Sequence, residues 1–131
     1  MTSSRTALSI PATKEYASVV RTTATALAAL FDADIYLVEN VRQAVDEAFV
    51  QAVSRSTGAG SIDFTFEYRD GVLTTCVFAE NSISGEPDDF NESISRAILS
   101  SFCDECHIQD SKTWTLTMSH NLRGAGGESE K

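Results

Sequence analysis

Hydrophobic and polar residues alternate along this chain with two different periods, and each change of period marks a new element. A period of two, as at Ile62, Phe64 and Phe66, is typical of a strand with one buried face. Apolar residues three or four positions apart, such as Val41 and Val45, indicate an amphipathic helix. The pattern predicts the order strand, helix, helix, strand, strand, helix, strand, strand.

Turn and capping residues set the limits of these elements. Pro11 closes the first strand, and Thr13 is the expected N-cap of the helix that follows. Asp70-Gly71 is a strong hairpin signal between the two central strands. The predicted elements are a strand at 5–10, a helix from Thr13 that breaks at 31–34, a helix capped by Asp32 or Asp34 that ends within 54–60, strands at 61–68 and 72–79, a helix at 89–102, and strands at 106–109 and 113–118. The expected buried face of the 89–102 helix consists of Phe90, Ile94, Ala97, Ile98 and Phe102.

Strands that alternate apolar and polar side chains bury one face only, so their sheet needs helices on one side. We therefore expect an α/β fold of the α+β type, a two-layer sandwich whose mostly antiparallel sheet is covered by helices on one face. The 131 residues fit one domain, which we place at 1–122. The tail at 123–131, RGAGGESEK, is expected to be disordered.

Charge narrows the classes of partner. The formal net charge is −9 and no basic stripe interrupts it, which argues against nucleic acid and suits a basic protein partner. No run approaches the length of a membrane span, and the N-terminal residues lack the apolar stretch of a signal peptide. We expect a cytoplasmic protein that is not bound to a membrane and whose three cysteines are reduced.

The helix predicted to end within 54–60 carries the sequence VRQAVDEAFVQA at 41–52. Glu47 and Gln51 lie four residues apart and share one face of this helix, with Gln43 on the same stripe. This stripe, the order of the elements and the segment AILSSFCDECHI at 97–108 resemble the GHKL (Bergerat-fold) ATPases, and most of all the bacterial anti-sigma serine kinases. The resemblance covers about residues 5–120.

The resemblance implies roles for residues of the stripe, which looks like the N-box of that family. The N-box glutamate orients or deprotonates the attacking hydroxyl, and Glu47 matches it as a general base. The family has a magnesium-binding asparagine four residues later, where this chain has Gln51. The longer glutamine side chain suits the demanding Mg²⁺ geometry only if the helix moves back. The alternative interpretation is that Gln43, Glu47 and Gln51 form the solvated face of an amphipathic helix.

The two other nucleotide-binding motifs of the family depart further from its pattern. Its adenine box falls at 79–85, where Glu80 supplies a carboxylate but serines replace glycines. Its phosphate box falls at 91–95, which contains no glycine and places Glu92 where a triphosphate would lie. We therefore expect no cofactor and a nucleotide site that is lost or much weakened, although the resemblance itself implies ATP and magnesium.

The resemblance also implies partners. In the family, the fold docks a sigma factor, an anti-anti-sigma protein of the STAS type competes for it, and the chains pair into homodimers through their sheets. Arg21 looks like the basic contact position of the family. We expect an anti-sigma-like regulator that sequesters a sigma factor. The alternative is an active ATP-dependent serine kinase that phosphorylates an anti-anti-sigma partner, with Glu47 as its base.

Three residues of the segment at 100–110 form the pattern C-x-x-C-H: Cys103, Cys106 and His107. Covalent haem needs this pattern on a helix and outside the cytoplasm, whereas Cys106 and His107 open a predicted strand and should face opposite ways. Zinc would have to recruit the isolated Cys76 and His120, because a second ligand pair is missing. We expect no metal, and a metal- or redox-sensing binding protein based on Cys103 and Cys106 remains a third interpretation.

Overall fold

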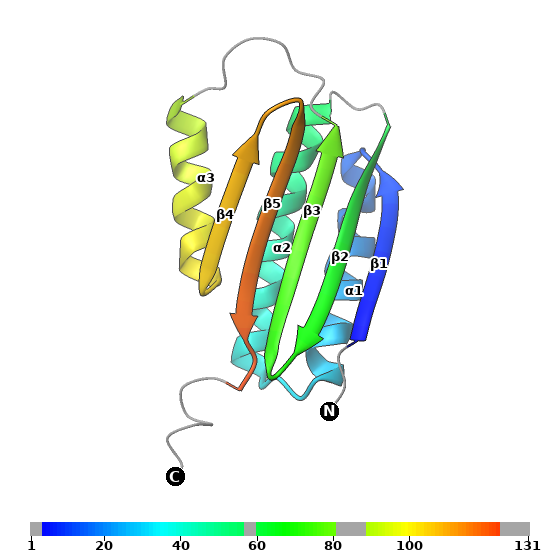
Figure 1. Ribbon diagram of the computed structural model, residues 1–131, viewed down its shortest axis with the longest axis vertical. Helices are drawn as coiled ribbons and strands as arrows, with labels where there is room; N and C mark the ends of the chain where they lie inside the picture. The colour runs from blue at the N-terminus through cyan, green and yellow to red at the C-terminus, as the bar shows by residue number, and fades with distance from the viewer. Residues whose placement is uncertain (1–3, 57–59, 81–88, 124–131) are drawn as a thin grey trace.

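The computed structural model describes residues 4–56, 60–80 and 89–123. Its elements follow the predicted order, with one additional 3-10 turn (Figure 1). They are β1 (Ser4–Pro11), the 3-10 turn η1 (Lys14–Tyr16), α1 (Ala17–Leu30), α2 (Ile35–Ser56), β2 (Ser61–Arg69), β3 (Val72–Glu80), α3 (Asp89–Phe102), β4 (Glu105–Asp110) and β5 (Thr113–Asn121). The predicted adenine box beyond Glu80 and the predicted tail beyond Arg123 lie outside the described residues.

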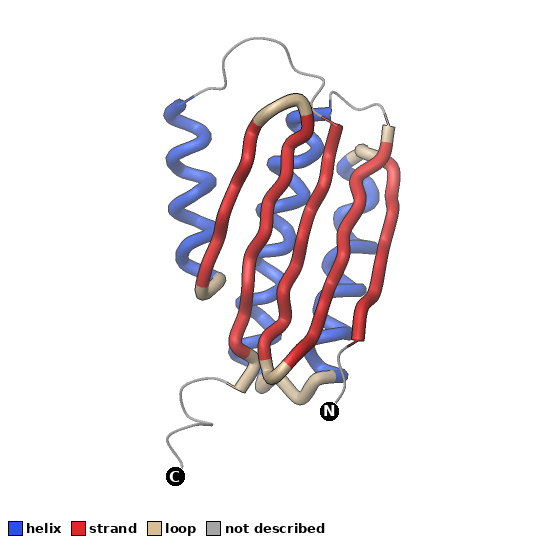
Figure 2. Tube along the Cα trace, in the orientation of Figure 1, coloured by secondary structure: helices blue, strands red, loops and turns tan. Residues whose placement is uncertain are grey.

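The five strands form one sheet in the order β1-β2-β3-β5-β4, and each neighbouring pair is antiparallel. The chain leaves the sheet after β3, passes through α3 to the outer strand β4, and returns as β5 between β4 and β3. All three helices lie on one side of the sheet, and the other face is open (Figures 1 and 2). The predicted two-layer antiparallel fold is confirmed.

The core lies mainly between the sheet and the helices α1 and α2. Alternating side chains of β2, β3 and β5 point toward the helices, and these include Phe64, Leu116 and the fully buried Trp114. On α2 the residues that meet them are Val41, Ala44, Val45, Ala48, Phe49 and Ala52. The alanines let α1 and α2 approach the sheet and each other closely, since α1 also buries Ala24 and Ala28.

The two predicted helix caps have different outcomes. Asp34 caps α2, because its carboxylate accepts the backbone N–H of Leu37 at 2.8 Å. Thr13 precedes the turn η1 and makes no side-chain cap hydrogen bond, so α1 begins four residues later than predicted, at Ala17. Asp32 has a positive φ of 67° and forms part of the sharp turn between α1 and α2.

The predicted buried face of α3 is wrong. Ile94 and Ile98 are 44% and 36% exposed, whereas Ser95 and Leu99 are buried. Ala97 is also exposed, Phe102 is only partly buried, and the side chain of Phe90 lies outside the described residues. The cause is the place of α3: it runs beside the outer strand β4 and contacts only α2 and β4 closely (Figure 1). A helix at the edge of the layer buries only a narrow stripe of side chains. In α3 the buried stripe of Ser95 and Leu99 is shifted by one residue from the apolar stripe of Ile94 and Ile98.

None of the helices within the described ranges combines the length and apolarity needed to cross a membrane.

His120 closes the far end of the core beneath the end of α3. Its Nε2 lies 2.7 Å from the carbonyl oxygen of Phe102, and a carbonyl only accepts, so Nε2 carries the proton. The ring is 2% exposed. Burial lowers the pKa of His120 below its ordinary value of 6.5, against smaller opposing effects of the Phe102 bond and of Asp104. The ring is therefore neutral in the folded protein at neutral pH.

This neutral histidine makes stability pH-dependent. Because the pKa of His120 is lower in the folded than in the unfolded chain, the unfolded chain gains a proton first as the pH falls below 6.5. The free energy of unfolding should therefore fall between about pH 7.5 and about pH 5.5 in urea titrations. His120→Gln keeps a hydrogen-bond donor for the carbonyl of Phe102 but does not titrate. The free energy of unfolding of this variant should therefore fall less over the same pH range. Equal falls in the two proteins would contradict this account.

Candidate functional site

The side of α2 that faces α3 and the β4–β5 hairpin carries three polar residues at helical spacing: Glu47, Gln51 and Arg55. We call these three residues the α2 stripe. Glu47 and Gln51 are half-buried, and Arg55 is buried. Arg55 was missed in the sequence, although its position four residues after Gln51 places it on the same face. Gln43, one turn before Glu47, bonds instead to Glu39 on its own helix at 2.9 Å.

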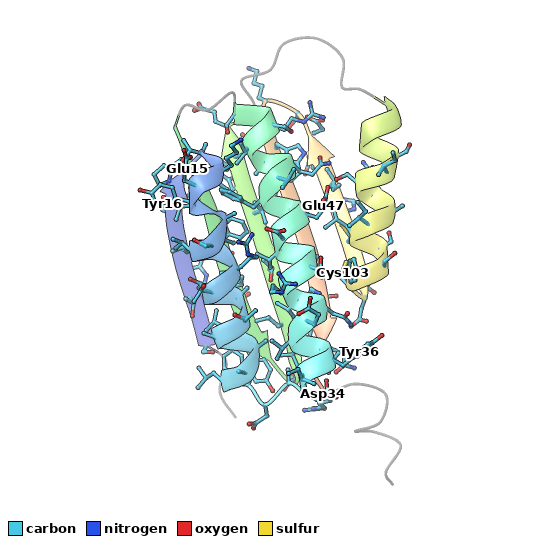
Figure 3. All side chains as sticks on the ribbon, turned by 180° about the vertical axis from the view of Figure 1, so that it is seen from behind. Glu15, Tyr16, Asp34, Tyr36, Glu47 and Cys103 are labelled. Carbon is cyan, nitrogen blue, oxygen red and sulfur yellow. The ribbon has the colours of Figure 1, made fainter. Side chains whose placement is uncertain are left out.

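Glu47 lies at the contact between α2 and α3 (Figure 3). The hydroxyl of Ser95 donates a hydrogen bond to its Oε2, and Ser95 is itself buried. Ser95 is the last residue of the predicted phosphate box. The structure thus joins the predicted general base to the predicted phosphate-binding segment, by a direct bond between two helices.

Arg55 ties the C-terminal end of α2 to the β4–β5 hairpin. Its guanidinium lies 2.5 Å from the Oδ2 of Asp110, and the two side chains are 10% and 24% exposed. The pair holds Arg55 in place, because loss of Asp110 would remove a counter-charge from a buried guanidinium. The two ends of the α2 stripe are therefore both engaged by groups of the same chain.

Trp114 fills the space on the helix-facing side of the sheet next to the predicted adenine box. It lies directly across the ladder from Ala79, the residue before Glu80, and is fully buried. Glu80 itself is exposed at the end of β3, and strand alternation directs it to the open face of the sheet. The structure therefore does not bring Glu80 to Glu47 and Gln51.

Arg21, the predicted partner contact, lies on α1. Its Nη1 is 2.8 Å from the Oδ1 of Asp46 on α2, and both side chains are about one-third exposed. The pair links α1 to α2 at their outer surface. Because it stays partly exposed, its guanidinium also remains within reach of a docking protein.

The three cysteines lie in two separate places. Cys103 follows the last residue of α3, and Cys106 is half-buried on the helix-facing side of β4. His107 is exposed on the opposite face, as predicted from the strand. Cys76 lies on the open face of the sheet, where its Sγ is 3.7 Å from the hydroxyl of Thr117. Across the residues that the structure describes, no three histidine, cysteine or acidic side chains gather as metal ligands would.

Comparisons with known proteins bear on the fold. No protein-family model and no curated protein matches the sequence. Among solved structures, the crystal structure of the RsbU and RsbW domains of Rv1364c from Mycobacterium tuberculosis is similar, with a TM-score of 0.72 at 18% sequence identity. The match covers 91% of this chain and 32% of that chain, so this chain spans about a third of the length of its neighbour. The likeness confirms the fold class.

The bond between Ser95 and Glu47 should contribute measurably to stability. Ser95→Ala leaves a half-buried carboxylate without this donor and should lower the free energy of unfolding by about 1–3 kcal/mol. Ser101→Ala is the matched control, since Ser101 is an exposed serine of the same helix that bonds only to the carbonyl of Ala97. Its effect should stay within about 0.5 kcal/mol. Urea titration measures both, and similar small values would show that the bond does not hold α3 to α2.

Proposed function

We propose that this protein is an anti-sigma-like regulator that binds and sequesters a sigma factor in the cytoplasm, with ATP binding and kinase activity lost or much weakened. Two observations support the anti-sigma part. The segment at 41–52 resembles the N-box helix of the anti-sigma serine kinases, and the fold is similar to a structure that contains an RsbW domain. The chain would act by stoichiometric binding.

The loss of nucleotide binding rests on one observation: two of the three residues of the α2 stripe are bonded to other elements of the protein itself. Ser95 engages Glu47, and Asp110 engages Arg55. A nucleotide placed along this stripe would have to displace at least one of these contacts. A displacement that costs about 3 kcal/mol weakens an affinity roughly a hundredfold. The net charge of −9 opposes a triphosphate further.

The open face of the sheet is available for the homodimer that the resemblance implies. Its side chains are largely polar: threonines and serines of the central strands β3 and β5 stand beside charged residues of β1, β2 and β4, such as Arg5, Glu67 and Glu105, and Phe78 is about half exposed. The helical side would then remain free for the sigma factor and for a competing anti-anti-sigma protein of the STAS type. We place Arg21 in that contact, because the helical layer presents it at its outer surface.

The second candidate function is an active serine kinase that phosphorylates an anti-anti-sigma partner. It is favoured by Glu47, which stands at the N-box position with its carboxylate at the contact between α2 and α3. Incubation of the protein with labelled ATP and a captured partner decides between the two functions. Phosphate transfer that Glu47→Ala abolishes would establish the kinase and overturn the proposal of a lost nucleotide site.

An affinity pull-down of the tagged protein from its own host, read by mass spectrometry, tests the partner. The proposal expects a sigma factor in near-stoichiometric yield. An anti-anti-sigma protein without a sigma factor would place the chain in the same regulatory circuit but contradict direct sequestration. Recovery of neither would contradict the proposed function as a whole.

The only tryptophan of the chain gives a direct test of nucleotide binding. Trp114 lies beside the position of the predicted adenine box, so a bound nucleotide would change its fluorescence. We expect no saturable change in fluorescence up to about 1 mM Mg-ATP. A dissociation constant of about 1 mM corresponds to a binding free energy of only about 4 kcal/mol in magnitude. Unfolding in urea serves as the control that the emission responds to its surroundings. A saturable change at micromolar Mg-ATP would contradict the prediction.

Arg21 needs a test that separates partner contact from its ion pair with Asp46. Arg21→Glu should abolish binding of the captured sigma factor and also place two carboxylates together. The double variant Arg21→Glu/Asp46→Arg restores an ion pair with reversed order, so stability should return to within about 1 kcal/mol. Binding should remain lost if Arg21 contacts the partner. Recovery of wild-type binding in the double variant would show that Arg21 acts only within the helical layer.

A further inference from the structure

Cys103 and Cys106 lie together where the end of α3 meets the start of β4. They are three residues apart on either side of the short connection between the two elements, and neither is oxidised. Both side chains are about half-buried and pack against the edge of the core. Cys103 also donates its S–H to the carbonyl of Leu99 at 3.1 Å, so it has two alternative acceptors, that carbonyl and the sulfur of Cys106.

The surroundings give the two thiols different reactivities. The hydrogen bond from Cys103 lowers the pKa of Cys106 to about 7, and the positive charge of Arg96 on α3 acts in the same direction. The same bond, burial and the nearby Asp104 raise the pKa of Cys103. Cys103 also follows the C-terminal end of α3, where the helix dipole disfavours a thiolate. His120 lies close by on β5 but is neutral and bonded to Phe102.

We propose that Cys103 and Cys106 are a peroxide-reactive dithiol, in which Cys106 is oxidised first and Cys103 then closes a reversible intramolecular disulfide. This inference does not depend on the proposed anti-sigma function. Cys103 directly follows α3 and Cys106 is the second residue of β4, so the disulfide would link the end of α3 to the start of β4. A cytoplasmic disulfide of this kind is transient and suits a sensor.

The chemistry balances with a hydroperoxide as the oxidant. The Cys106 thiolate attacks one oxygen of the peroxide, an S–O bond forms, the O–O bond breaks, and the leaving hydroxide or alkoxide takes up a proton. The sulfur of Cys103 then attacks the resulting sulfenic acid, so that an S–S bond forms and the S–O bond breaks. The proton of Cys103 leaves with the hydroxide as water. Two thiols are oxidised by two electrons, and one peroxide is reduced.

Oxidation changes how α3 is anchored. In the reduced protein the S–H of Cys103 bonds to Leu99, the fully buried residue of α3. The disulfide removes that donor and replaces it with a covalent link to β4. The same helix carries Ser95, whose hydroxyl engages Glu47, so the dithiol sits at one end of the contact between α3 and α2.

The test uses the full, reduced chain treated with a small excess of hydrogen peroxide, then alkylated and mapped by mass spectrometry. We expect a disulfide between Cys103 and Cys106 that dithiothreitol reverses, while Cys76 stays alkylatable. Cys76→Ser is the matched control and should form the disulfide at the wild-type rate, because Cys76 lies on the open face of the sheet. Preferential oxidation of Cys76, or disulfides between chains in place of the internal one, would overturn the proposal.

Two variants of Cys103 test its role as the resolving thiol. Cys103→Ser keeps a hydroxyl donor for Cys106 but cannot form the disulfide, so a sulfenic acid should accumulate on Cys106 and be captured by dimedone. Cys103→Ala removes the donor, so the midpoint of the pH dependence of Cys106 alkylation should move from about 7 toward the ordinary 9.0. At about pH 7 the alkylation of wild-type Cys106 should then exceed that of the alanine variant by roughly tenfold or more. Unchanged midpoints, or no dimedone adduct on Cys106, would overturn the assignment.

Discussion

The burial of α2 against the centre of the sheet sets the position of the α2 stripe. α2 packs on β2, β3 and β5 with its valine, alanine and phenylalanine side chains, and it also contacts both other helices. Its polar residues therefore lie away from the sheet, either on the outer surface and toward α1, as Asp46 does, or on the side that turns toward α3 and the β4–β5 hairpin. Because a helix of 22 residues keeps this register along its whole length, Glu47, Gln51 and Arg55 follow one line from the middle of α2 to its C-terminal end.

The hydrogen-bond and ion-pair partners of these residues connect the fold to its proposed role. Buried or half-buried polar groups need partners, and here the partners come from α3 and from Asp110 at the end of β4. Such contacts stabilise the closed arrangement of α2 and α3 and work against any ligand that would separate them. The surfaces left for other molecules are the helical layer, which has exposed apolar side chains such as Ile35, Ile94 and Ile98, and the open face of the sheet. Surfaces of this kind suit protein partners better than a small anionic ligand.

Much of the fold could be predicted because it depends on local periodicity. The alternation in β2 and the Asp70-Gly71 turn fix a hairpin with one buried face, and the structure has both. The buried side of α3 could not be found in this way, since it depends on α3 lying at the edge of the sheet. The same holds for the ion pair between Arg55 and Asp110, which are 55 residues apart. Glu47 and Gln51 were found from their spacing, whereas Ser95, the partner of Glu47, was not.

The central claim is that the fold binds its partner without help from a nucleotide. The most direct measurement is the dissociation constant of the captured sigma factor, determined by titration calorimetry in nucleotide-free buffer and again with excess Mg-ATP or Mg-ADP. The account predicts one-to-one binding of each chain and constants that agree within about twofold, because the α2 stripe is closed in every case. A change of about tenfold or more, equivalent to roughly 1.4 kcal/mol of coupling, would contradict it.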